Sequence, residues 1–227
     1  MSEHPPLTAA IPYAPPGDDG RPPLFADACL LVVDKPAGLL SVPGRGDAHQ
    51  DCLIARLHAR GYDDARIVHR LDMATSGLLV VARGDAAQRE LSRQFRERQV
   101  DKRYVAIVAG LMPDDAGSID LPLICDWPNR PRQMVDFTIG KPSLTHYRVL
   151  ARDPASDSTR VELEPVTGRS HQLRVHLAAL GHPILGDELY AGAAAARAPR
   201  LLLHASKIRF FHPSTVESLE FSSPPPF

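Results

Sequence analysis

The sequence predicts a single-domain α+β protein, in which a few helices flank a mixed, mainly antiparallel sheet. Three observations support this fold class. The chain has 227 residues, of which 44% are hydrophobic and 23% are charged, an ordinary globular composition. Short apolar runs typical of strands dominate its second half. Few helical segments alternate with these strands, whereas a doubly wound parallel sheet requires regular alternation.

The first half of the chain predicts two strands and two helices. Apolar runs at residues 28–33 and 77–82 indicate buried strands. Apolar residues at i, i+3 and i+4 predict a short helix over 51–60, which Gly61 ends. A second helix is expected over 86–99, directly after the second strand.

The second half is predicted to be mostly strands. Seven short runs qualify, at residues 104–108, 119–124, 135–139, 145–150, 161–166, 201–204 and 208–211. One helix interrupts them at 170–180, with a Ser near its start and Gly181 just past its end. Its leucines, including Leu173 and Leu177, share one face.

The N-terminal segment differs in composition from the rest. Residues 1–23 contain seven prolines, so we expect an extended, flexible arm followed by one catalytic domain over 24–227. We expect a cytoplasmic protein without a membrane partner, because the sequence shows neither a secretory signal pattern nor a long apolar run. Three widely spaced cysteines predict free thiols. We also expect a monomer.

Charge is unevenly distributed along the chain. The formal net charge is -1, which argues against a simple polycation that coats nucleic acid. Residues 83–103 nevertheless hold seven Lys/Arg against four acids. In the predicted helix there, Arg89, Arg93 and Arg96 share one face. Two interpretations stand: a solvated face, or a face that contacts RNA phosphates.

Common catalytic signatures are missing. The sequence contains no GxxxxGK[ST], GxGxxG, HExxH, GxSxG or CxxC motif. Nucleotide hydrolysis, NAD chemistry and zinc catalysis therefore lack positive support. The histidines at 171, 176 and 182 do not have metal-binding helical spacing, and we expect no metal site.

Three short segments carry candidate chemistry. Residues 69–77, HRLDMATSG, place Asp72 beside basic residues just before a buried strand. An ion pair that ties down a turn would also explain this loop. Tyr104 begins a predicted strand in KRYVA, and Arg174 lies at i+3 from His171 in GRSHQLRVH. A core aromatic and a surface helix charge are the plain alternatives for Tyr104 and Arg174.

Together these segments resemble the RluA family of pseudouridine synthases. The HRLD box with its following TSG, the KxYxA segment, and GRSHQLRVH with its continuation GHPILGDELY occur in the family's order, over about residues 30–209. The resemblance implies a pseudouridine synthase fold. It also implies that a uridine in structured RNA is converted to pseudouridine, by breaking the N1–C1′ bond and joining C5 to C1′, without a cofactor.

The resemblance also implies roles for individual residues. Asp72 matches the essential carboxylate, acting either as nucleophile or as base. Tyr104 matches the tyrosine that packs on the target uracil, and Arg174 matches the basic residue that pairs with the carboxylate. The target base must be flipped out of its stack, and Arg70 matches the residue that fills the gap. RNA contacts are also expected at His69, Thr75 and His171.

A candidate RNA-reading segment lies at residues 124–133. Trp127, Arg130 and Arg132 are interleaved with prolines, a composition suited to stacking on loop bases. Trp127 packed as a lid on the core is the alternative. Larger relatives often begin with an S4-type RNA-binding domain, which we do not expect here. Together with residues 39–45, the segment resembles short family members that modify both the tRNA anticodon stem-loop and a 23S rRNA hairpin.

Two other function classes stay open at this point. The chain could be a non-catalytic RNA-binding module or an RNA chaperone, which the presence of Asp72, Tyr104 and Arg174 disfavours. A glycoside hydrolase is the other alternative, but such enzymes usually need two carboxylates flanking the bond, and these motifs offer one. With a near-neutral chain, RNA affinity is expected to come from local basic faces and to fall steeply with salt.

Overall fold

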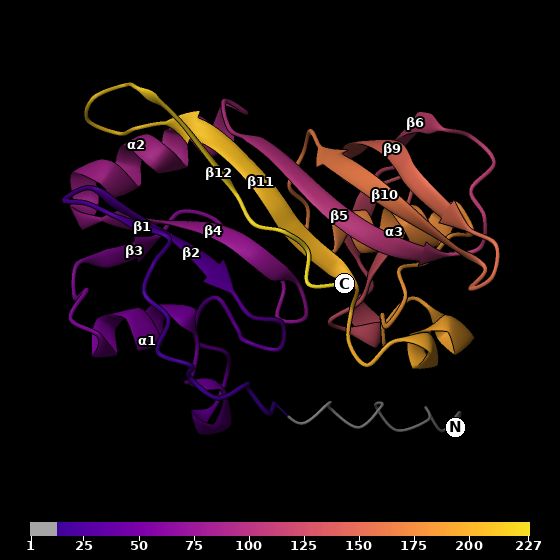
Figure 1. Cartoon of the computed structure of the whole chain (residues 1–227), viewed down its shortest axis with the longest axis horizontal. Coiled ribbons are helices and arrows are strands. Elements are labelled where there is room, and N and C mark those ends of the chain that lie inside the picture. The colour runs from indigo at the N-terminus through magenta and orange to yellow at the C-terminus, as the bar shows by residue number, and fades with distance from the viewer. Residues whose placement is uncertain (1–12) are drawn as a thin grey trace.

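The computed structural model describes residues 13–227, most of whose strands join one large sheet (Figure 1). In chain order the strands are β1 (Phe25–Ala26), β2 (Leu30–Lys35), β3 (Ala65–Ile67), β4 (Ser76–Arg83), β5 (Asp101–Ala109), β6 (Ala116–Asp120), β7 (Leu123–Cys125), β8 (Gln133–Val135), β9 (Leu144–Asp153), β10 (Ser158–Pro165), β11 (Leu203–Phe211) and β12 (Ser218–Ser222). The α-helices are α1 (Leu53–Ala59), α2 (Gly84–Arg96) and α3 (Gln172–Ala179), and short 3-10 helices cover Asp47–His49, Trp127–Asn129 and Gly192–Arg197.

The predicted α+β class is confirmed. The large sheet has the order β1-β2-β4-β11-β5-β10-β9-β6, with β3 on β4 and β12 on β11, while β7 and β8 form a separate pair. Within the part of the chain that the structure describes, β4 and β11 are the parallel pair, and the other paired strands are antiparallel.

Residues 30–33 of β2 and 78–82 of β4 are buried on both faces of the sheet, which explains why these two runs are unbroken apolar sequences. One set of alternating residues, including Leu31 and Leu79, packs with α1. The other set, including Leu30 and Leu78, packs with α2. Helix α3 packs against the other half of the sheet, where Leu177 is fully buried. Helix α2 packs on the sheet through Leu91, which has no exposed surface.

Gly77 explains why the candidate loop ends in TSG. Strand β4 pairs with β11 at Ser76 and Gly77, opposite His204 and Ala205. Gly77 has φ +111°, and a Cβ there would lie 2.4 Å from the carbonyl oxygen of Ala205. A side chain would therefore push the two strands apart exactly where the two halves of the sheet join.

Several predicted strand boundaries were wrong. The run 119–124 divides between β6 and β7 at Leu121 and Pro122, and Pro122 has no amide proton for a ladder. The run 135–139 ends at Val135, because the Asp136 carboxylate accepts the backbone N–H groups of the next turn. The runs 201–204 and 208–211 instead form the single strand β11, which has an irregular register near Ser206.

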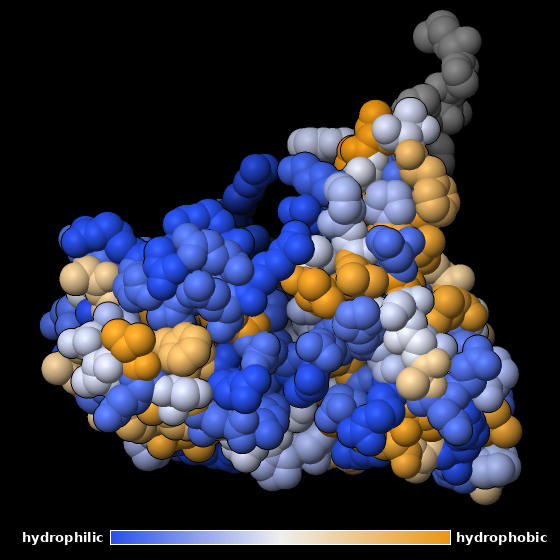
Figure 2. Space-filling model, turned by 90° about the horizontal axis from the view of Figure 1, so that it is seen from above, coloured by the Kyte–Doolittle hydropathy of each residue, from blue (hydrophilic) through white to orange (hydrophobic). Residues whose placement is uncertain are grey.

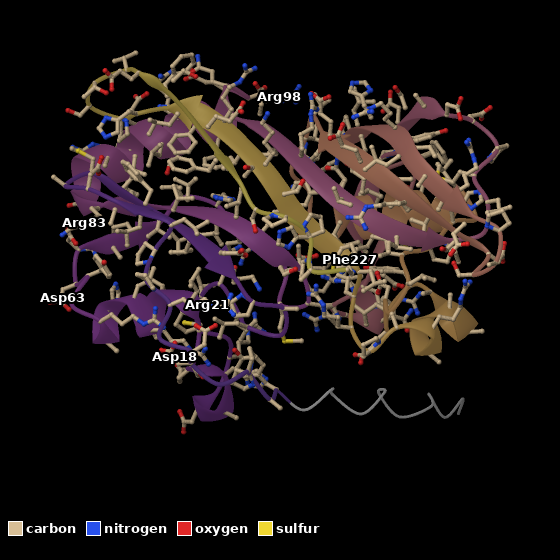
Figure 3. All side chains as sticks on the ribbon, viewed as in Figure 1. Asp18, Arg21, Asp63, Arg83, Arg98 and Phe227 are labelled. Carbon is tan, nitrogen blue, oxygen red and sulfur yellow. The ribbon has the colours of Figure 1, made fainter. Side chains whose placement is uncertain are left out.

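The N-terminal arm behaves differently from the expectation in the part that can be described. Residues 1–12 lie outside the described residues. The Tyr13 hydroxyl donates to the Asp51 carbonyl at 2.7 Å, and Arg56 donates to the Pro16 carbonyl at 2.6 Å. Asp18 and Arg21 lie on the α1 side of the molecule (Figure 3), where Arg60 binds both. Residues 13–21 are therefore fixed to the domain.

Within residues 13–227, the longest helices are too short and too polar for a bilayer crossing.

Candidate active site

Asp72 lies in a loop whose backbone is fastened on both sides. The Ser41 hydroxyl donates to the Leu71 carbonyl at 2.8 Å. The Gly38 N–H donates to the Met73 carbonyl at 2.8 Å. These bonds hold the residues before and after Asp72 and so fix the position of its backbone. The Asp72 side chain is 29% exposed.

Lys35 also holds the backbone of this loop, and the sequence analysis missed it. Its side chain is fully buried at the end of β2, and its Nζ donates to the carbonyls of Pro36, Leu39 and Met73. Burial lowers the pKa of Lys35 to about 7, while the nearby Asp72 carboxylate acts in the opposite direction. A lysine two residues past the apolar run of β2, on the buried side of the strand, was the available signal.

Arg174 of α3 connects two carboxylates. Its Nη1 lies 3.5 Å from Oδ2 of Asp72, and its Nε and Nη2 bind both oxygens of Asp187 at 2.8 and 2.7 Å. The Arg174 side chain is 6% exposed and that of Asp187 is 0% exposed. Burial alone would lower the pKa of Arg174, but its hydrogen bonds to Asp187 raise it. The surface-charge alternative for Arg174 is therefore wrong.

Asp187 was missed by the sequence analysis, although its GD dipeptide lies within the quoted GHPILGDELY. The preceding Gly186 has φ +74°, and a Cβ there would lie 1.8 Å from the Arg200 carbonyl oxygen. Asp187 also accepts the backbone N–H groups of Leu189 and Tyr190. Because Arg174 and these amides already bind it, Asp187 is a holder of Arg174 and not a second flanking acid.

Tyr104 of β5 lies near the same carboxylate. It pairs with Ala205 of β11, which pairs in turn with Gly77, so Tyr104 is two strands or about 10 Å from the end of the Asp72 loop. Burial raises the pKa of Tyr104 well above its usual range, and the Asp72 charge adds to this shift. Its phenol is therefore neutral and keeps its proton.

His171 and Tyr190 complete the site. His171 precedes α3 with φ +53°, a conformation uncommon outside glycine. Its Nε2 lies 4.0 Å from Oδ2 of Asp72, and its Nδ1 lies 2.6 Å from the Tyr190 hydroxyl. Burial lowers the pKa of His171 despite the nearby Asp72 charge. The Tyr190 ring lies 5.1 Å from the guanidinium carbon of Arg174, and sequence analysis did not single this tyrosine out.

The other predicted residues of the Asp72 loop differ in their surroundings. Arg70 is exposed beside Asp72, as an RNA contact requires. Thr75 is 3% exposed and cannot present its side chain to RNA. His69 accepts the Val80 N–H at 2.9 Å and stacks on Phe95 at 4.3 Å. Thr75 and His69 thus serve the fold, and we withdraw them as RNA contacts.

The candidate RNA-reading segment forms a surface hairpin. Strands β7 and β8 pair across residues 123–135, which we call the 123–135 hairpin. Trp127 is 64% exposed, with the guanidinium of Arg130 4.6 Å above its ring. The lid alternative for Trp127 is therefore wrong. Arg132 lies 5.4 Å from the Tyr190 ring, so the hairpin adjoins the Asp72 site.

The arginines of α2 face a different setting. Arg93 forms ion pairs with Glu90 and Glu97, and Arg96 lies 3.9 Å from Glu97. Arg89 is exposed. The C-terminal half of α2 contacts Phe211, seven residues along β11 from His204, hence on the order of 20 Å from the Asp72 loop. The paired arginines favour the solvated-face interpretation for most of this face.

Among residues 13–227, one group has the composition of a metal site: Asp27, Cys29 and His212. Nδ1 of His212 accepts the backbone N–H groups of Ser214 and Thr215. The ring proton is therefore on Nε2, which donates to Asp27 at 2.9 Å. Because Nε2 would have to lose that proton to bind a metal, this group fits a hydrogen-bonded link between two turns better than a metal centre.

The comparisons with known proteins show the family of this chain. A family model described as RNA pseudouridylate synthase matches residues 29–179, and the chain belongs to this family. The dual-specificity RNA pseudouridine synthase RluA of Escherichia coli (strain K12) is 54% identical over 217 residues, 95% of this chain and 98% of that relative. RluA of Pasteurella multocida (strain Pm70) is 52% identical over 220 residues, 96% of this chain and 100% of that relative.

A solved structure supports the fold assignment. Human RNA Pseudouridylate Synthase Domain Containing 1 is 33% identical, with a TM-score of 0.77 over 94% of this chain and 87% of that chain. The protein is thus an enzyme that isomerises uridine to pseudouridine in RNA. The predicted family, fold and isomerase function are confirmed, and the RNA-chaperone and glycoside hydrolase alternatives are set aside.

Proposed function

We propose that the enzyme has two RNA substrates, a tRNA anticodon stem-loop and a 23S rRNA hairpin loop. The observation that carries this proposal is the extent of similarity to a dual-specificity enzyme. The Escherichia coli relative is 54% identical over 98% of its length, so the segments that bind its RNA substrates have counterparts in this chain. The exposed Trp127 and Arg130 of the 123–135 hairpin support it, because base stacking tolerates different flanking sequences.

In this proposal, Asp72 is the one carboxylate that acts on the substrate. Arg174, held by Asp187, keeps the Asp72 carboxylate ionised and oriented when RNA closes the pocket. Tyr104 packs against the flipped uracil with a neutral phenol. These three residues come from the loop before β4, from β5 and from α3, and their proximity supports a shared role.

Three arginines are the proposed RNA contacts near the site. Arg70 is exposed and lies two residues before Asp72. Its planar guanidinium is suited to fill the gap that the flipped base leaves in the stack. Arg130 and Arg132 bind the loop backbone from the 123–135 hairpin. Hydrophilic residues cover most of the face shown in Figure 2, and hydrophobic residues occur there in small groups.

We further propose that residues 24–227 act as one catalytic domain, that the enzyme is a monomer, and that it works in the cytoplasm where its RNA substrates occur. The continuous sheet that joins β1 to β6 supports one domain.

Tritium release from RNA labelled at uracil C5 tests the substrate proposal. The experiment compares an anticodon stem-loop with a ribosomal hairpin of similar loop sequence, alone and in competition. We expect release from both RNAs and mutual competitive inhibition, because one site serves both. Release from one RNA only, with the other neither modified nor inhibitory, would contradict dual specificity while leaving the isomerase activity intact.

A further inference from the structure

Tyr190 lies at the junction of the Asp72 site and the 123–135 hairpin. The backbone N–H of Gln133, in β8, donates to the Tyr190 hydroxyl oxygen at 2.8 Å. The same hydroxyl lies 2.6 Å from Nδ1 of His171. Its ring contacts two guanidinium groups, that of Arg174 at 5.1 Å and that of Arg132 at 5.4 Å. One side chain therefore touches the hairpin and both basic groups that approach Asp72.

The direction of one of these hydrogen bonds follows from the groups involved, and it leaves the Tyr190 hydroxyl proton for the other. A backbone N–H can only donate, so the Tyr190 oxygen is an acceptor toward Gln133. The hydroxyl proton is then free to be donated to His171 Nδ1, which accepts it in the neutral tautomer that is protonated on Nε2. Burial raises the pKa of Tyr190 to about 12, so the phenol keeps this proton. In a neutral imidazole whose Nδ1 accepts, the ring proton is on Nε2.

That tautomer places a donor against the proposed catalytic carboxylate. His171 Nε2 lies 4.0 Å from Oδ2 of Asp72, and Arg174 Nη1 lies 3.5 Å from the same oxygen. Both donors approach Oδ2 of Asp72. Arg174 is at hydrogen-bond distance from Oδ2, and His171 Nε2 lies 0.5 Å farther from it. Two N–H groups directed at one oxygen distinguish the two oxygens of a carboxylate, since the other keeps its lone pairs for the substrate.

We propose that Tyr190 is a positioning residue: it fixes His171 as the Nε2–H tautomer, so that His171 and Arg174 together hold Oδ2 of Asp72 and leave Oδ1 to face the substrate. The inference rests on the proposed role of Asp72. Because Gln133 fixes the Tyr190 hydroxyl, the donor is set correctly only when the 123–135 hairpin is seated against the site. The hairpin thus serves the chemistry as well as RNA recognition.

The first test is Tyr190→Phe, which keeps the ring between the two arginines and removes the hydroxyl. Single-turnover tritium release at saturating RNA is expected to fall about tenfold, the effect of one lost hydrogen bond in the reacting complex, with the RNA Kd unchanged within about twofold. Tyr62→Phe, beside α1, is the matched control and should react like the wild type. A wild-type rate for Tyr190→Phe would overturn the inference.

A double-mutant cycle shows whether the effect passes through His171. In a His171→Ala background, Tyr190→Phe should cause no further loss of single-turnover rate. Losses that multiply independently would overturn the inference, because a general weakening of the site would not depend on His171. Thermal unfolding of each variant identifies any loss that comes from misfolding.

The tautomer can be measured without any substitution. Ring ¹⁵N NMR of His171 in the intact enzyme should show a protonated Nε2 and an unprotonated Nδ1, and Tyr190→Phe should shift this population. A protonated Nδ1 in the wild type would overturn the inference. Asp72→Asn is measured alongside: if it reacts at the wild-type rate, the proposed role of Asp72 fails, whereas an inactive Asp72→Asn with a fully active Tyr190→Phe refutes the positioning inference alone.

Discussion

Arginine is used in opposite ways at the Asp72 site and on the face of α2. Arg174 is 6% exposed and shares its guanidinium between Asp187 and Asp72. Arg93 of α2 also pairs with two carboxylates, those of Glu90 and Glu97, but these side chains are 33% to 43% exposed. In water a similar ion pair contributes little, whereas in a buried site the loss of one partner leaves an uncompensated charge. Similar contacts therefore have different consequences.

The 123–135 hairpin differs from both regions. There, Arg130 lies over an exposed indole, and Arg132 over a tyrosine ring of the site. A guanidinium stacked on an aromatic ring keeps its hydrogen-bond donors at the ring edge free for a phosphate or a base. The comparison indicates that an arginine count along the sequence does not locate an RNA surface. The partner of each arginine decides whether it is available.

The largest expected effect comes from removing the buried partner. Asp187→Asn leaves Arg174 buried with a weakened neighbour, so the free energy of unfolding should fall by about 3–5 kcal/mol. Chemical denaturation measures this change. Glu90→Gln is the matched control on α2, and its midpoint should equal that of the wild type within error. Equal losses for the two variants would contradict the distinction between the regions.

Buried and exposed groups should also differ in their response to acid. Desolvation lowers the pKa of His69 to about 3, with the charge of Lys102 adding to the effect. The unfolded chain takes up this proton near pH 6.5 and the folded protein only near pH 3, so stability falls as the pH falls through that window. Between pH 6.5 and 5 this one group should cost about 2 kcal/mol.

Denaturation of wild type and His69→Gln across this pH range measures the proton difference. Below pH 6.5, the free energy of unfolding of the variant should depend on pH less steeply, by a slope equivalent to about one proton. The reason is that Gln can accept the Val80 N–H without titrating. Parallel curves for the two proteins would show that His69 is not held neutral.

At the hairpin, Trp127→Ala should weaken RNA binding by about tenfold, within the range for one stacked base. Its indole is 64% exposed, so the melting temperature should not change. Binding is measured with the anticodon stem-loop. Phe211→Ala, an exposed aromatic on β11, is the control, and a loss of affinity as large in this variant would place the stacking surface elsewhere.

The smallest effect is expected in the salt dependence of binding. Replacing Arg130 and Arg132 by Ala should reduce the slope of log K against log salt by about 0.7 for each lost phosphate contact. Arg93→Ala should leave the slope unchanged, because Glu90 and Glu97 already occupy its guanidinium. A reduced slope in Arg93→Ala would show that the α2 face contacts RNA after all.

Much of this molecule was predictable from short-range patterns. The buried strands β2 and β4 and the three α-helices follow from unbroken apolar runs and helical spacing. What the sequence could not show depends on distant contacts. The role of Asp187 depends on the turn at Gly186, which brings the Asp187 carboxylate to the guanidinium of Arg174. His69 and Thr75 looked available for RNA because their motif is polar, yet the fold uses both.

The family resemblance predicted more residues of the candidate site than residue chemistry alone did. On chemistry alone, Arg174 and Tyr104 each had a plain structural explanation. The structure places Tyr104 near Asp72 because β4, β11 and β5 are neighbours in the sheet, and Arg174 reaches Asp72 from α3. Tyr190 needed the three-dimensional fold, since its partners Gln133 and His171 are far apart in the chain.

The central claim is that Asp72 is the one carboxylate that carries out the isomerisation. Single-turnover tritium release from an anticodon stem-loop labelled at uracil C5 tests it directly, with wild type and Asp72→Asn compared at RNA concentrations above the Kd. The account predicts wild-type RNA binding by Asp72→Asn and no detectable release. Release at a rate near that of the wild type would contradict it and would require a different group to act on the ribose.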